Sequence, residues 1–247
     1  SISQQQLKEI KDFSNKNKIS VKLIPENKAI YSKDFVLEHY GTTPILKPKQ
    51  LPFEKIETHI LKRFFDIVFS LLVIVCLLSW LLPILWILVK TDSKGNFFFK
   101  QIRDGVDGKQ FYCYKIRSMK INKDSDRIHT TKNDDRVTKV GVLLRKTSLD
   151  ELAQFFNVLK GDMSIVGPRP HMNIQTEKYL KEIDNYIIRN SVKPGITGLA
   201  QVNNIDMSTP DKLARTDAIM IKKMSLKNYF LYIIKTVTGS GAGDAVK

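Results

Sequence analysis

One long stretch of the chain is uncharged and predominantly apolar. Residues 67–89 run for 23 positions without a charged side chain, which is long enough for a helix to cross the hydrocarbon core of a bilayer. Pro83 interrupts the stretch and should bend the helix, because proline removes a backbone donor and clashes with the preceding turn. Basic residues flank the stretch at both ends: Lys62 and Arg63 before it, Lys90 and Lys94 after it.

The two basic flanks favour a helix whose ends lie on the same side of the membrane. Positively charged segments tend to stay in the cytoplasm, so a simple spanning helix would place one basic flank on the wrong side. A helix, a break and a second helix over residues 61–91, re-entering one leaflet, agrees with the length, the bend and both flanks. An ordinary kinked spanning helix is the alternative that the residues leave open.

After residue 91 the pattern is that of a soluble, α-rich α/β domain. Residues 97–102 and 109–116 are apolar and aromatic, and the glycine-rich turn between them predicts a β-hairpin. A polar, charged loop is expected at 121–136. The helix predicted nearest the end of the domain, at 226–237, is either an amphipathic helix on the membrane surface or an ordinary core helix. Helical patterns are found at 149–159, 174–188, 210–222 and 226–237.

The pattern divides the chain into four segments. The first segment, residues 1–60, has a predicted helix at 4–15 and a predicted strand at 21–24. The chain opens with polar residues and with Ser1 rather than Met, so we expect no signal peptide and a processed or truncated product. The segments are a small α/β part (1–60), the membrane segment (61–91), the main domain (92–238) and a flexible glycine-rich tail (239–247).

Charge and cysteine content narrow the function classes. The chain carries 40 Lys and Arg against 25 Asp and Glu, a formal charge of +15. Its partners should therefore be anionic: nucleic acid, acidic lipid headgroups or phosphorylated small molecules. The two cysteines, Cys76 and Cys113, form no spaced pair, so a disulfide framework or a zinc site is not expected and a reducing cytoplasm fits best.

The densest group of charges lies near residue 150. Ser148 and Glu151 have the spacing of a helix capping box. That interpretation leaves Asp150 unexplained, together with Arg145 upstream of it. A helix N-terminus binds anions, and a carboxylate such as Asp150 can attack phosphorus if a cation such as Mg²⁺ screens the repulsion. Simple capping and phosphoryl chemistry both remain open on these residues alone.

Four motifs occur in an order that resembles one known family, the bacterial sugar transferases. These are the monotopic polyprenyl-phosphate phosphoglycosyl transferases, and the resemblance covers about residues 61–237. The densest motif includes the Asp150-Glu151 pair. The four motifs are Lys62–Asp66, Tyr114–Met119, Arg145–Pro170 and Val192–Val202.

The resemblance implies a two-step reaction. Asp150 would attack the β-phosphate of a UDP-sugar and release UMP, and polyprenyl (undecaprenyl) phosphate would then displace the phosphosugar from the enzyme. Glu151 would position Mg²⁺, with Asp150 as the neighbouring carboxylate of the metal site. The expected phosphate contacts are Arg145, Arg169, Lys115 and Arg117.

The resemblance also implies a setting. The expected fold is a monotopic membrane protein with a re-entrant helix, a small hairpin and a helical catalytic core bearing interfacial amphipathic helices. It would act at the cytoplasmic face of the bacterial inner membrane, in contact with membrane lipids, in the first membrane step of exopolysaccharide, capsule, O-antigen or glycoprotein glycan synthesis. A homodimer is possible. Residues 1–60 would correspond to the end of a nucleotide-fold-like domain of longer members.

Two departures from the family pattern matter. Ser79-Trp80 stands where many members have Ser-Pro at the break in the membrane helix. Asn204 stands where many have Gly, and this second departure leaves open which UDP-sugar is the donor. The alternative function is a membrane-tethered, basic, non-catalytic scaffold or binding protein. Nucleic acid is not expected as a partner, because the basic residues are scattered and the densest group of them includes carboxylates.

Overall fold

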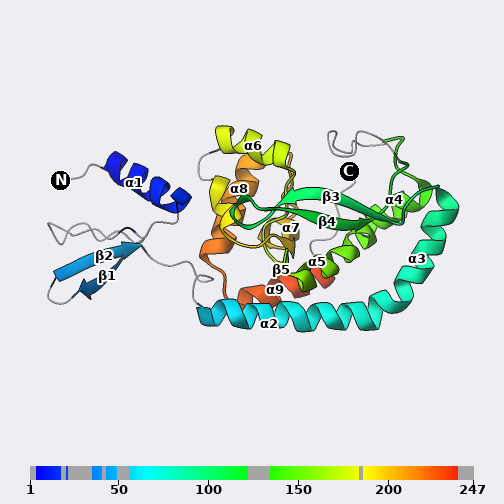
Figure 1. Cartoon of the computed structure of the whole chain (residues 1–247), viewed down its shortest axis with the longest axis horizontal. Helices are drawn as coiled ribbons and strands as arrows, with labels where there is room; N and C mark the ends of the chain where they lie inside the picture. Colours follow the sequence, from blue (N-terminus) through cyan, green and yellow to red (C-terminus); the bar gives the residue numbers. More distant parts are fainter. Residues whose placement is uncertain are drawn as a thin grey trace. The chain divides into compact units, whose positions relative to one another are not determined.

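The protein has two compact units, Ser1–Leu51 and Pro52–Lys247. The larger unit contains every residue of the four motifs. Figure 1 shows the computed structural model, which describes residues 4–17, 21, 35–40, 43–48, 56–121, 134–183 and 186–238.

The described part of the smaller unit contains a helix and a hairpin. Helix α1 (Gln4–Asn17) confirms the helix predicted at 4–15. Strands β1 (Phe35–Tyr40) and β2 (Thr43–Pro48) pair antiparallel, and neither was predicted. Of the strand predicted at 21–24, Val21 is in no regular element and the rest lies outside the described residues.

The apolar stretch forms a continuous helix that bends. It has three consecutive pieces: α2 (Ile56–Val73), a π-helical turn (Ile74–Leu78) and α3 (Ser79–Asp92). Figure 1 shows the change of direction from α2 to α3, so the predicted bend is present. Pro83 has no N–H to donate to the Ser79 carbonyl, and the π-helical turn ends just before Ser79. Both features bend a helix. Among the described residues, Glu57–Asp92 is the one helix long and apolar enough to cross a membrane.

A two-stranded hairpin follows the bent helix. Strands β3 (Phe98–Asp104) and β4 (Gln110–Ile116) pair antiparallel with Phe98 opposite Ile116, which confirms the predicted hairpin. Most of the loop predicted at 121–136 lies outside the described residues.

Short helices make up most of the remaining chain. They are α4 (Lys139–Lys146), the 3₁₀ helix η4 (Leu149–Ala153), α5 (Gln154–Lys160), α6 (Asn173–Glu182), the 3₁₀ helix η5 (Tyr186–Ser191), α7 (Leu199–Val202), α8 (Pro210–Lys222) and α9 (Leu226–Val237). Strands β5 (Ser164–Val166) and β6 (Gly195–Thr197) pair in parallel.

The predicted helices are largely confirmed. Those at 210–222 and 226–237 match α8 and α9. The one at 149–159 begins as η4 and continues as α5, and the one at 174–188 is divided between α6 and η5. Helix α4 was not predicted.

An apolar core joins the bent helix to the hairpin and to η4. Its buried side chains are Leu85, Val89, Phe97, Ile116, Leu144 and Ala153, and full burial of each larger one contributes about 1.5–3 kcal/mol. Asn157 of α5 adds a polar tie, because its buried amide accepts from Tyr114 N at 2.9 Å and donates to Tyr112 O at 2.7 Å. The core and this tie fix η4 and α5 against β4.

A buried carboxylate ties α2 to the rest of the larger unit. Asp66 Oδ1 accepts from the Ser164 hydroxyl at 3.0 Å, Ile165 N at 2.9 Å and the Tyr229 hydroxyl at 2.8 Å. Its Oδ2 accepts from Lys62 at 3.3 Å. Asp66 thus connects α2 with β5 and α9.

Helix α9 is apolar on two faces. Tyr229, Tyr232 and Ile233 are buried in the unit. The other face exposes large apolar side chains, namely Phe230, Leu231, Ile234 and Val237. The core interpretation therefore holds for one face, and the other face keeps the surface that an interfacial helix requires.

Candidate active site

A single cavity brings the predicted site residues together. Its volume is about 770 Å³, and it lies between the hairpin, η4 and the segment around Pro170. All six residues predicted for catalysis and phosphate contact line it: Asp150, Glu151, Arg145, Arg169, Lys115 and Arg117.

The local backbone presents Asp150 to this cavity. Thr138 is the N-cap of helix α4, and its hydroxyl oxygen accepts from Gly141 N at 3.0 Å. After α4, Ser148 adopts the left-handed conformation with φ of 56°, which is uncommon for a residue other than glycine. The chain turns sharply there, and Asp150 follows in the first turn of η4.

The capping-box interpretation of Ser148 and Glu151, one of the two that the sequence left open, does not hold. The Ser148 side chain makes no capping hydrogen bond, and its backbone carbonyl instead accepts from Glu151 N at 3.2 Å. An N-cap side chain reaches its amide from an extended backbone, whereas Ser148 is left-handed. The Glu151 carboxylate is directed to basic side chains instead of to the start of the helix.

Glu151 is held by two cations. Lys115 Nζ donates to Oε1 at 2.8 Å, and Arg169 reaches Oε1 at 2.6 Å and Oε2 at 3.3 Å. Burial acts to raise the pKa of Glu151, but Arg169 and Lys115 outweigh it and hold that pKa well below its usual range. Glu151 in turn raises the pKa of Arg169. Glu151 is therefore ionised and firmly placed.

Asp150 has a different environment. Its side chain is 7% exposed, and among the described residues no group hydrogen-bonds to its carboxylate. Burial raises the pKa of Asp150, Lys115 opposes that effect, and the Glu151 charge adds to it. The two neighbouring carboxylates are thus driven apart in pKa, with Asp150 the more basic. A buried, unengaged carboxylate of raised basicity suits attack on an electrophile.

The two arginines near the dyad have different partners. Arg145 Nε donates to the Ser118 hydroxyl at 2.8 Å. Arg117 donates to backbone carbonyls at the end of α3, those of Ser93 at 2.7 Å, Val89 at 3.4 Å and Lys94. Arg117 therefore caps the bent helix, and its phosphate contact stays a prediction.

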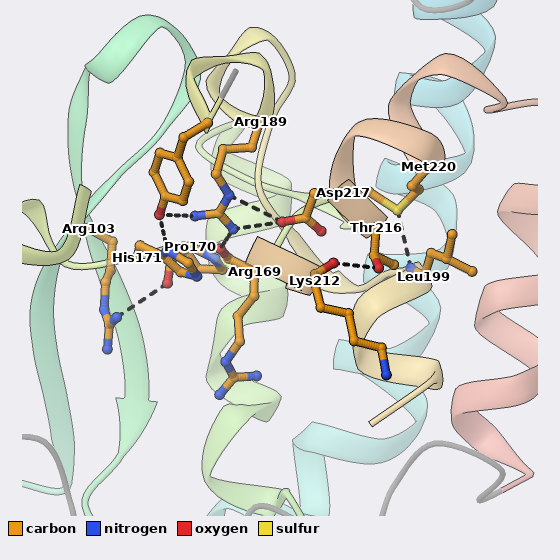
Figure 2. A network of polar contacts seen from close by, with 11 residues as sticks. Arg103, Arg169, Pro170, His171, Arg189, Leu199, Lys212, Thr216, Asp217 and Met220 are labelled. Atoms are coloured by element: carbon orange, nitrogen blue, oxygen red, sulfur yellow. Dashed lines mark hydrogen bonds and ion pairs between the residues drawn. The ribbon is translucent and has the colours of Figure 1, made fainter. Parts of the chain in front are cut away.

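A buried network behind Arg169 was not predicted from the sequence. Figure 2 shows Arg189 pairing with Asp217 and reaching the backbone of Arg169, with His171 and Arg103 nearby. His171 follows the Pro168-Arg169-Pro170 motif directly, so its position in the sequence was a usable signal. Arg189 and Asp217 lie 28 residues apart and outside every motif.

The donor set suits a metal only with help from substrate. Within the described residues, no group of three His, Cys, Asp or Glu side chains could hold a metal ion. Mg²⁺ needs only one or two carboxylates when substrate phosphates and water complete its shell. Asp150 and Glu151 Oε2 together meet that need. Glu151 Oε2 accepts only the longer hydrogen bond from Arg169, at 3.3 Å.

The comparison with known families decides the assignment. A family model described as bacterial sugar transferase matches residues 57–241. The chain belongs to the bacterial sugar transferase family. The match includes the bent helix, the hairpin and the whole cavity, so the family expected from the four motifs is confirmed.

Bacterial sugar transferases with curated names share extensive identity with this chain. Two relatives carry the name UDP-glucose:undecaprenyl-phosphate glucose-1-phosphate transferase. The protein from Klebsiella pneumoniae is 47% identical over 71% of this chain, and the protein from Escherichia coli is 45% identical over 74% of it. An undecaprenyl-phosphate galactose phosphotransferase of Salmonella typhimurium is 35% identical over 92% of the chain. The alignments cover 40%, 39% and 50% of these three relatives, so the chain spans half their length or less.

Proposed function

We propose that this protein transfers a sugar-1-phosphate from a UDP-sugar to undecaprenyl phosphate. The observation that carries the proposal is the arrangement of the dyad: Asp150 is buried and unengaged beside Glu151, which two cations neutralise. Relatives whose names state this reaction share the segment that contains the dyad.

The proposed reaction has two balanced steps. In the first, an Asp150 oxygen bonds to the sugar-bearing phosphorus while the bond from that phosphorus to the bridging oxygen breaks, and UMP leaves with the oxygen and its electron pair. In the second, an oxygen of undecaprenyl phosphate attacks the same phosphorus. The acyl phosphate bond then breaks, which regenerates the Asp150 carboxylate and gives undecaprenyl diphosphate sugar.

The cations of the site have separate tasks in this proposal. Lys115 and Arg169 hold Glu151, and Arg145 lies on the cavity wall near Asp150. Seven lysines and arginines line the cavity against two carboxylates, and this positive surplus favours a diphosphate. Asp150 and Glu151 Oε2 would hold Mg²⁺, which when bound would neutralise the charge that develops on the phosphate oxygens.

The bent helix is proposed to re-enter the cytoplasmic leaflet of the bacterial inner membrane. The bend and the basic residues on both flanks support a helix that returns to the side from which it came. Helix α9 would lie at the surface of the same membrane. Its Phe230 contacts Phe65 of α2, and the apolar side chains beside Phe230 on α9 are exposed. The soluble donor and the lipid acceptor could then reach one cavity.

UMP release from a panel of UDP-sugars tests the function. We expect detergent-extracted protein, supplied with undecaprenyl phosphate and Mg²⁺, to release UMP from at least one donor. Chelation should reduce release to background and added Mg²⁺ should restore it. A folded sample that releases no UMP from any donor would instead support the non-catalytic scaffold, and undiminished release after chelation would remove Mg²⁺ from the proposal.

Removing the Lys115 charge should move the acidic limb of the pH profile. Attack requires ionised Asp150, so kcat/KM falls as the pH drops through the pKa of that group. Lys115 lowers this pKa, so Lys115→Met should shift the limb to higher pH. The measurement is kcat/KM across pH, with Lys109→Met as the exposed hairpin control. A limb that moves to lower pH, or moves equally in the control, would contradict the assignment.

A further inference from the structure

The segment that carries Arg169 has no regular secondary structure, yet every carbonyl along it is held. The four consecutive carbonyls of residues 168–171 each accept a hydrogen bond from a different residue. The donors are Gly195 N to Pro168 O at 2.9 Å, Arg189 Nη2 to Arg169 O at 2.7 Å, Arg103 Nη1 to Pro170 O at 3.3 Å and Asp104 N to His171 O at 3.0 Å.

Arg189 is the donor that acts on Arg169 itself, and its own position is fixed. Its Nε and Nη2 donate to Asp217 Oδ2 at 3.2 and 3.0 Å, and its Nη1 donates to the Tyr186 hydroxyl at 3.0 Å. The Arg189 and Asp217 side chains are 4% and 0% exposed. Figure 2 shows the guanidinium between Asp217 and the Arg169 backbone.

The network also holds His171. The Tyr186 hydroxyl accepts from Arg189 Nη1 and is also in hydrogen-bond contact with His171 Nδ1. His171 lies two residues after Arg169 and lines the cavity. One buried ion pair thus restrains the segment at two points.

A buried ion pair needs an explanation beyond stability. Desolvation of the two charges offsets much of their attraction, and a well-packed apolar pair often stabilises as much. A hydrophobic pair could not donate to the Arg169 carbonyl. The Arg169 side chain is 44% exposed, so packing alone does not place its guanidinium; its backbone must be placed correctly.

We propose that the Arg189–Asp217 pair is a positioning device that sets the backbone of Arg169 so that its guanidinium meets Glu151. Neither Arg189 nor Asp217 lines the 770 Å³ cavity among the described residues, so they act through Arg169 and do not touch substrate. This inference rests on the proposed function, in which Glu151 and Arg169 belong to the reacting site.

The test is a double-mutant cycle between the device and Arg169. Arg189→Lys keeps a charge for Asp217 but cannot reach Asp217, Tyr186 and the Arg169 carbonyl together. We expect it to lower kcat by about 10- to 100-fold, the scale of a small misplacement of a catalytic group. In an Arg169→Ala background the same substitution should lower kcat no further. Equal fold losses in both backgrounds would show a purely structural role and overturn the inference.

A matched pair of tyrosine variants checks that general loss of stability is not the cause. Tyr186→Phe removes the hydroxyl that Arg189 contacts, and Tyr229→Phe removes a buried hydroxyl bonded to Asp66, away from the cavity lining. Both should lower the unfolding temperature, but only Tyr186→Phe should lower kcat. Equal kcat losses would count against positioning.

A binding measurement separates this inference from the proposed function. If wild-type protein releases no UMP, the proposed function fails, and the cycle is then measured as the Kd for UDP with Mg²⁺ by calorimetry. The inference is still supported if Arg189→Lys raises the Kd in the wild-type background but does not change it in the Arg169→Ala background. Additive changes in Kd, or unchanged binding in Arg189→Lys, reject it.

Discussion

Replacing Asp150 with asparagine should abolish UMP release while leaving the protein folded. The amide has nearly the same shape but cannot form the bond to phosphorus, and loss of a nucleophile typically costs roughly 10³-fold or more in kcat. The fold should survive, because among the described residues no hydrogen bond to the Asp150 carboxylate is lost. Removal of a buried charge beside Glu151 even relieves a repulsion.

Three measurements decide this expectation. They are UMP release, the unfolding temperature, and the intact mass of protein mixed with UDP-sugar and no lipid acceptor. Wild-type protein should gain the mass of a sugar phosphate, and Asp150→Asn should not. Asp211→Asn, which changes an exposed carboxylate on α8, is the matched control and should behave as wild type. Wild-type turnover in Asp150→Asn would reject the nucleophile assignment.

Replacing Asp66 with alanine should destabilise the larger unit by about 3–5 kcal/mol, the usual cost of breaking a buried ion pair by removing one of its two groups. The substitution leaves Lys62 without its carboxylate and removes the shared acceptor of Ser164, Ile165 and Tyr229. Helix α2 would lose its polar tie to β5 and α9.

Denaturation of detergent-extracted protein measures this cost. The midpoint for Asp66→Ala should fall well below that of wild type, whereas Asp211→Ala should change it little, because an exposed carboxylate has no such partners. Asp66→Asn should lie between them, since it keeps one acceptor oxygen. A loss of less than about 1 kcal/mol in Asp66→Ala would mean that α2 is held mainly by its apolar contacts.

Local patterns predicted the elements whose folding is decided locally. The hairpin and the helices α8 and α9 were found because alternation, turn glycines and helical periodicity lie within each segment. The parallel pairing of β5 with β6 was not, because each strand has three residues and their partners are distant in sequence. The capping box failed because the residue type at Ser148 does not reveal its left-handed backbone.

The site shows the same division. Lys115, Asp150, Glu151 and Arg169 were identified from motifs, and the fold places them on one cavity. Arg117 belongs to a motif too, but it lies just past the end of β4 and donates to carbonyls in the last turn of α3 and just beyond it. Arg189 and Asp217 could not be found, because a buried ion pair between distant segments leaves no local periodicity or motif.

The shared core has a practical consequence for anyone who wishes to work without detergent. Leu85 and Val89 belong to the bent helix, yet they pack with Phe97, Ile116 and Leu144, and Ile116 also lines the cavity. A shortened protein that begins after α3 would lack part of the apolar core of the site, along with the Val89 carbonyl that accepts from Arg117. A water-soluble version is better sought by placing polar residues on the outer face of the helix, at exposed positions such as Leu71, Leu72 and Val75.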